Sequence, residues 1–226
     1  MPDPTTGILD DFNRANEDPR SDGGNWGTDF SATDPLQVLS NRAAGKAPPT
    51  LTSDSYWQVS SFNADQEVYA TMAVQPSEHM RGIWVAARIQ SPSGTLKTWD
   101  GYTAILARLR GGTPAATGFI DELTGGSRLL PSLHVGAGSD AVGLYAVTND
   151  AHTLIGQAPV LAVAGSRLWL KCSGTTITVY HDGGPGFEEV IAVTDATVNA
   201  AGFVGLRIRG PTARAAPATS SAAVRE

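Results

Sequence analysis

Segments in which apolar and polar residues alternate recur along this chain, and turns that contain glycine or proline separate most of them. The clearest segment runs from Glu67 to Val74. One side of it carries Val68, Ala70, Met72 and Val74, and the other side carries Glu67, Tyr69 and Thr71. Because successive side chains of a β-strand point to opposite faces, such a segment has one face to bury and one left for solvent or a ligand. The chain must therefore pair its strands into sheets and pack the apolar faces together.

The turn signals divide the chain into many short predicted strands. These run over 7–14, 35–39, 56–61, 66–75, 82–90, 101–110, 118–123, 128–135, 167–173, 175–181, 189–194 and 202–209. Tight turns at Gly174 and in the glycine-rich loop 180–186 predict two consecutive antiparallel hairpins. The 226 residues include 25 glycines and 14 prolines, which leaves little room for long helices. The predicted fold class is all-β, a two-sheet antiparallel sandwich.

The chain shows no repeat and no composition break that would split the sandwich, so we expect one domain over 8–209. Residues 1–7 form a polar N-terminal lead. Residues 210–226 form an Ala/Pro-rich tail without the large apolar residues that a core needs. This tail is either a disordered end or a docking arm that orders against a partner.

Charge and hydropathy exclude two classes of partner. Nucleic-acid binding requires clustered lysines and arginines, and the net charge of −6 argues against such a surface. The first residues carry neither a basic region nor an apolar signal, and no stretch is apolar over the roughly 18 residues that span a bilayer. We therefore expect a protein made in the cytoplasm that does not insert into a membrane.

Several short motifs, taken in order along the chain, resemble one family. They are Leu9-Asp-Asp-Phe-Asn-Arg-Ala15, Gly23-Gly-Asn-Trp26, Val38-Leu-Ser-Asn-Arg-Ala-Ala44, Asp65-Gln-Glu-Val-Tyr-Ala-Thr71, Asp100-Gly-Tyr102, the strand-turn-strand 167–180 and Ala201-Gly-Phe-Val-Gly-Leu206. This pattern resembles bacteriophage virion structural proteins that carry a laminin-G-like or concanavalin-A-like jelly roll. The resemblance implies a jelly-roll sandwich of the concanavalin-A-like lectin and glucanase type.

The resemblance also implies a non-enzymatic role on the virion exterior, as a minor tail protein or a capsid decoration. The protein would be synthesised in the host cytoplasm and would bind neighbouring virion proteins, with a host-surface glycan as a further candidate partner. Contacts between copies, if the protein is a homo-oligomer, would come from the sandwich surface or the two termini. A free lectin-like carbohydrate-binding module is one alternative.

A glycoside hydrolase or lyase is the other alternative, and Asp65 and Glu67 are its first candidate residues. Their spacing puts both carboxylates on one face of a strand, as glycosidases with a carboxylate pair about 5–5.5 Å apart require. The next position on that face is Tyr69, so the acidic pattern is only two residues long. A solvated strand start explains the same two residues, and we predict no catalytic residue and no enzyme activity.

No cofactor or metal is predicted. The histidines lack the spacing of a zinc site; they are His79, His134, His152 and His181. Calcium stays a hypothesis, because sandwich lectins bind it through loop carboxylates, but no Asp-x-Asp-x-Asp loop is present. Its candidate ligands are Asp10, Asp11, Asp18 and Asp22. The single cysteine, Cys172, stands in an apolar run and is expected to be buried.

A shallow groove for a glycan or for another protein is the remaining candidate site, because flat rings match the apolar faces of sugars. Its predicted residues are Trp84, Arg88, Trp99, Tyr102 and Arg108. Strand alternation groups Ile83, Val85, Ala87 and Ile89 on the face opposite Trp84 and Arg88. The competing interpretation is that Trp84 packs under a loop and the arginine stems cover apolar surface. The other tryptophans, Trp26, Trp57 and Trp169, are predicted to lie in the core or at its edge.

Overall fold

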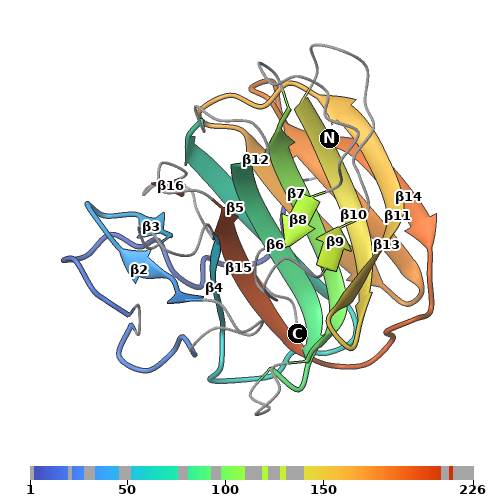
Figure 1. The fold of residues 1–226 in the computed structure, drawn as a ribbon, viewed down its shortest axis with the longest axis horizontal. Coiled ribbons are helices and arrows are strands. Elements are labelled where there is room, and N and C mark those ends of the chain that lie inside the picture. The colour runs from blue at the N-terminus through green and yellow to red at the C-terminus, as the bar shows by residue number, and fades with distance from the viewer. Residues whose placement is uncertain are drawn as a thin grey trace.

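The computed structural model describes residues 3–19, 22–27, 34–45, 52–75, 81–92, 98–109, 119–121, 128–130, 140–209 and 214–215. Every regular element among them is a β-strand (Figure 1), which confirms the all-β fold class. No helix in this part of the chain is long and apolar enough to cross a bilayer.

Two seven-stranded sheets make up the sandwich. The first sheet runs in the order β1 (Asp34–Pro35), β4 (Thr52–Tyr56), β15 (Phe203–Arg209), β6 (Arg81–Gln90), β7 (Asp100–Arg108), β10 (Asp140–Thr148) and β11 (Ala151–Val160). The second sheet runs in the order β14 (Glu188–Thr194), β13 (Thr176–Asp182), β12 (Arg167–Ser173), β5 (Gln66–Val74), β16 (Arg214–Ala215), β3 (Ala43–Ala44) and β2 (Gln37–Val38). A separate hairpin joins β8 (Phe119–Asp121) to β9 (Arg128–Leu130).

The core lies between the facing sides of the two sheets. The apolar side of β5 is buried there, as alternation predicts, through Val68, Ala70 and Met72. Facing strands of both sheets add residues such as Leu106 and Leu170, and two of the tryptophans, Trp26 and Trp57, close the same cluster. Burial of this apolar surface is the main driving force that holds the two sheets together.

Hairpins fix the register of the C-terminal strands. The turn at Gly174 has a positive φ of 53° and joins β12 to β13, and the loop 183–187 joins β13 to β14. Both predicted hairpins are confirmed. Glycine reaches the left-handed region without the steric cost that a side chain adds, so it suits the tight turn.

The first predicted strand, 7–14, is wrong, because these residues form no strand. Asp10 Oδ1 accepts a hydrogen bond from the amide of Phe12 at 2.7 Å, and Asp11 Oδ1 accepts one from the amide of Asn13 at 2.9 Å. Phe12 also has a positive φ of 55°. Such local bonds from aspartate side chains favour turns over a strand ladder. The strand predicted over 56–61 is also misplaced, since β4 ends at Tyr56.

The sequence did not predict strands β10 and β11. Every residue of β10 except Thr148 is buried, so both of its faces are covered and the sequence shows no alternation. Their turn is Asn149-Asp150, with positive φ at both residues, 52° and 63°. That dipeptide favours a two-residue hairpin turn and was the signal that could have located the pair.

The C-terminal tail is described only at 214–215, where it forms β16 between β5 and β3. The tail therefore contributes a short strand to the second sheet of its own domain. The rest of 210–226 lies outside the described residues. The same holds for residues 118, 122–123 and 131–135 of the predicted strands 118–123 and 128–135.

His181 provides a test of the packing of β13. Its strand partner is Leu168, a core residue, so the imidazole faces inward and is buried. Burial lowers the pKa of His181, although the charges of Asp182 and Glu188 act in the opposite direction. Because the unfolded chain binds this proton at higher pH than the folded chain does, stability should fall as pH drops below about 6.5.

We expect His181→Gln to lose less stability than the unmodified protein when the pH is lowered from 7.5 to 5. Urea unfolding at the two pH values, followed by tryptophan fluorescence, measures the difference. An equal loss in both proteins would show that His181 is not responsible for the acid sensitivity.

Candidate functional site

The five residues of the predicted groove do not share an exposed face. Four of them, Trp84, Arg88, Trp99 and Tyr102, are buried, and Arg108 is half-buried at the end of β7. They are also divided between the two sides of the first sheet. The prediction that these five residues line one open groove is therefore wrong.

A bulge in β6 explains the error. Arg88 has a positive φ of 54°, and the pairing with β7 shifts register between Ala87 and Gln90. The extra residue reverses the alternation, so Ile89 packs with Trp99 on the outer side of the sheet. Arg88 turns away from the side that carries Trp84 and enters the end of the sandwich.

Arg88 ties together three segments that are far apart in sequence. Its guanidinium donates hydrogen bonds to the carbonyls of Ala64 at 2.7 Å, Val198 at 2.9 Å and Gly174 at 2.6 Å. It also lies 5.9 Å from the ring centroid of Tyr102. Its position makes Arg88 a structural residue, because a ligand cannot reach a fully buried guanidinium whose donors face backbone carbonyls.

Trp84 belongs to a buried layer on the outer side of the first sheet. The Arg207 guanidinium lies 4.7 Å from the ring centroid of Trp84 and forms an ion pair with Asp54, at 3.0 Å between Nη2 and Oδ2. The His152 ring makes edge contacts with Trp84 and Trp99 at centroid distances of 6.3 and 5.9 Å. Trp84 is 3% exposed, so its ring is covered within this layer.

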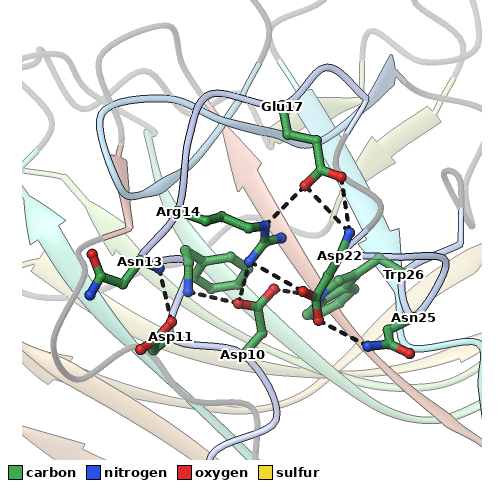
Figure 2. Close-up of polar contacts among 9 residues, drawn as sticks. Asp10, Asp11, Asn13, Arg14, Glu17, Asp22, Asn25 and Trp26 are labelled. Atoms are coloured by element: carbon green, nitrogen blue, oxygen red, sulfur yellow. Dashed lines mark hydrogen bonds and ion pairs between the residues drawn. The ribbon is translucent and has the colours of Figure 1, made fainter.

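Two of the four aspartates of the calcium hypothesis, Asp10 and Asp22, lie beside the guanidinium of Arg14 (Figure 2). Arg14 donates to Asp10 at 2.7 Å and to Glu17 at 3.0 Å, and its Nη1 lies 3.8 Å from Asp22. The second oxygen of Asp10 accepts the Trp26 indole N–H at 2.7 Å. These three carboxylates share one guanidinium, which compensates part of their negative charge.

The described residues contain no group of three or more His, Cys, Asp or Glu arranged to hold a metal ion. Asp11 accepts a hydrogen bond from the backbone amide of Asn13, and Asp18 is exposed. His79 and His134 lie outside the described residues. The opening motif 9–15 joins the loop at 22–26 through Arg14, which lies between two of the carboxylates that the calcium hypothesis named.

The two candidate catalytic carboxylates have separate structural roles. Asp65 Oδ1 accepts the Gly174 amide at 2.6 Å and so holds the β12–β13 turn. Glu67 is only 3% exposed, and its Oε1 accepts hydrogen bonds from Thr5 and Thr6 of the N-terminal lead. Asp65 fits the predicted solvated strand start, whereas Glu67 does not.

A pocket of about 570 Å³ lies over the paired ends of β5 and β12. It is lined by Asn63, Ala64, Asp65, Gln66, Glu67, Lys171, Cys172 and Ser173. Glu67 and Lys171 are direct register partners across the two strands, so both side chains leave the sheet on the same face. Burial raises the pKa of the Cys172 thiol to about 12, which keeps the thiol protonated and chemically inert near neutral pH.

A row of aromatic rings adjoins this pocket on the same outer face of the second sheet. Trp169 stacks on Tyr180 with ring centroids 4.2 Å apart and an interplanar angle of 23°. Tyr69 is the register partner of Trp169 on the other side, and Lys171 Nζ lies 5.9 Å from the Trp169 ring centroid. Lys171 therefore belongs to both the pocket and the row, and we call them together the β5–β12 site.

Sequence reasoning missed this site because Trp169 was assigned to the core or its edge. Trp169 is 1% exposed, so its burial is as predicted, but it lies on the outer face beneath Tyr180 and Phe187. The signal was available in the alternation of β12. Arg167, Trp169 and Lys171 are out of phase with the core residues Leu168, Leu170 and Cys172.

Comparison of the whole fold with solved structures identifies its class. The carbohydrate-binding module CBM66 from Bacillus subtilis superposes with a TM-score of 0.55 at 17% identity, over 88% of this chain and 95% of that one. The legume lectin-like domain from Entamoeba histolytica gives 0.53 at 10% identity, over 96% of both chains. The VIP36 exoplasmic/lumenal domain, in a Ca²⁺- and mannose-bound form, gives 0.52 at 11% identity, over 89% of this chain and 90% of that one.

The chain has a lectin-like jelly-roll fold. This confirms the predicted two-sheet jelly roll of the concanavalin-A-like type. No protein-family model and no curated protein matches the sequence. None of the three structural neighbours is described as a virion protein, so the resemblance to phage proteins finds no support in them.

Proposed function

We propose that this jelly roll binds carbohydrate, without catalysis, through the β5–β12 site. The observation that carries the proposal is the polar pocket at Glu67 and Lys171, which continues into the aromatic row at Trp169 and Tyr180. Sugars are bound by this combination, because polar side chains bond their hydroxyl groups and aromatic rings contact their C–H groups. The carbohydrate-binding proteins that share the fold support the same class of ligand.

Each part of the site has a role in this proposal. Glu67 accepts hydrogen bonds from sugar hydroxyls, while Lys171 and Ser173 donate them. The half-buried rings of Tyr69 and Tyr180 flank Trp169 and offer apolar contact to the sugar next in the chain. Binding over such a shallow surface is expected to be weak for a single sugar and stronger for a polymer, which contacts the pocket and the row together.

A binding screen with matched variants tests this proposal. We expect saturable binding to at least one of a panel of soluble neutral polysaccharides (mannan, dextran and a β-glucan) in affinity gel electrophoresis. Tyr180→Ala and Lys171→Ala should each weaken it by about tenfold, the equivalent of about 1.4 kcal/mol. Thr153→Ala, an exposed change on β11 in the other sheet, is the control and should bind normally. Variants that bind as well as the unmodified protein would remove the site from the proposal.

The glycosidase alternative predicts a different result. A hydrolase would release reducing sugar from a polysaccharide, and replacing both Asp65 and Glu67 with alanine would abolish that release. We expect the unmodified protein to release none, because Asp65 is bonded to the Gly174 amide and holds the β12–β13 turn, which leaves Glu67 without a second catalytic carboxylate. Release that disappears in the double variant would establish the enzyme.

The place where this module acts is a separate proposal. The resemblance of the opening motif 9–15 to phage structural proteins supports the exterior of a virion, with neighbouring virion proteins as partners. Cryo-microscopy of particles with labelled protein tests it. Density at the tail would indicate an adsorption role, and repeated density over the shell would indicate a decoration protein. Absence from purified particles would leave a free lectin-like module.

A further inference from the structure

The N-terminal lead lies against the carboxylate at the centre of the β5–β12 site. The Thr5 amide and hydroxyl donate to Glu67 Oε1 at 2.9 and 3.2 Å, and the Thr6 hydroxyl donates at 3.0 Å. These contacts join residues that are 61 and 62 positions apart in the chain. One carboxylate oxygen therefore receives two neighbouring hydroxyl groups.

We infer that the lead is a built-in occupant of the β5–β12 site, and that a neutral ligand with adjacent hydroxyl groups takes its place on Glu67. This inference rests on the proposed function. Two adjacent hydroxyls of a sugar ring present the same pair of donors as Thr5 and Thr6 present now. Hydroxyl donors form strong hydrogen bonds with a carboxylate, so two sugar hydroxyls replace the two threonine hydroxyls, and the bond from the Thr5 amide is given up.

The contacts that hold the lead are few enough for a ligand to displace it. Within the described residues, the hydrogen bonds of Thr5 and Thr6 all end on Glu67. Thr5 is exposed, and Ile8 is 57% exposed, so the lead has no apolar anchor at these positions. Gly7 lies between the lead and the anchored motif at Asp10, and a side chain there would meet nothing within 4 Å. Glycine has the widest backbone freedom of any residue, so Gly7 is where we expect the chain to bend when the lead leaves Glu67.

The charges of the pocket indicate which ligands benefit from the exchange. Asp65 and Glu67 face a single ammonium, that of Lys171, so the lining carries one more negative than positive charge. Glu67 loses its hydrogen-bond donors when the lead leaves, and it needs donors in return. A neutral glycan supplies them, whereas the carboxylate of an acidic sugar would repel both acidic residues.

The double variant Thr5→Val, Thr6→Val tests the exchange, because it removes both hydroxyl donors and keeps the shape of the side chains. We expect it to bind a neutral polysaccharide from the panel about five- to tenfold more tightly, since the ligand no longer competes with them. Glu67→Gln should bind more weakly than the unmodified protein. Thr194→Val, an exposed change at the end of β14, is the control and should change nothing.

Hydrogen exchange gives an independent readout of the same movement. Adding saturating polysaccharide should speed exchange at the Thr5 amide while it slows exchange in β5 and β12. If the unmodified protein binds glycan but the Thr5 and Thr6 variant has the same affinity and lead exchange is unchanged, the inference is wrong and the proposed function stands. If neither protein binds any polysaccharide of the panel, both fail.

Discussion

Arg88→Ala is expected to lower the free energy of unfolding by about 3–5 kcal/mol, in the range found when a buried charged group is removed from its partners. The change leaves the carbonyls of Ala64, Gly174 and Val198 without their donor, and the bond to Val198 is buried. It also opens a cavity, because Arg88 is among the largest fully buried side chains of the molecule.

Arg88→Lys separates the loss of hydrogen bonds from the opening of a cavity. A lysine keeps the charge and much of the volume, but one ammonium cannot reach three carbonyls that lie in different directions. We expect this variant to be destabilised by about 2–3 kcal/mol, less than Arg88→Ala. Urea unfolding measures both, with the exposed Glu189→Ala as the control. A loss below about 1 kcal/mol for Arg88→Ala would contradict the structural role.

Asp54→Ala is expected to cost a similar amount, about 3–5 kcal/mol, on the opposite side of the first sheet. Asp54 is 0% exposed and Arg207 has only 2% of its side chain exposed, so the pair is fully removed from water. Taking away Asp54 leaves the guanidinium buried without this carboxylate, against the ring of Trp84. Desolvation of that uncompensated charge is the physical cause of the loss.

The double variant Asp54→Ala, Arg207→Met identifies the cause. If the buried charge is responsible, removing it as well should recover part of the stability that Asp54→Ala loses, and the two changes will not be additive. Unfolding of the four proteins in a double-mutant cycle measures the coupling. Additive losses would mean that Asp54 and Arg207 act independently, contrary to their 3.0 Å contact.

Alternation was sufficient to predict the strands that have one face in the core and one outside. β5, β12 and β13 follow that rule, and their predicted ranges agree with the structure within one residue. β10 is covered on both faces, so it has no alternation to detect. The segment at Asp10 was predicted as a strand but bonds to itself through aspartate side chains, and it forms turns instead.

The candidate site could not be found in the same way. One bulge at Arg88 turned that side chain away from the side of the sheet that carries Trp84, so the predicted groove residues were divided between the two sides. The only warning was an arginine within the apolar run of β6. Glu67 was recognised as a candidate, but its partners at Thr5 and Thr6 are brought to it by the tertiary fold, which spacing along the chain does not reveal.

The most direct test of the proposed binding site is chemical-shift mapping of the backbone amides during titration with a soluble neutral oligosaccharide, cut from the polysaccharide that binds best in the screen. We expect the largest shifts in β5 and β12 around Glu67 and Lys171, in β13 near Tyr180, and in the lead at Thr5. Shifts centred on the first sheet around Trp84, or no shifts at all, would contradict the assignment of carbohydrate binding to the β5–β12 site.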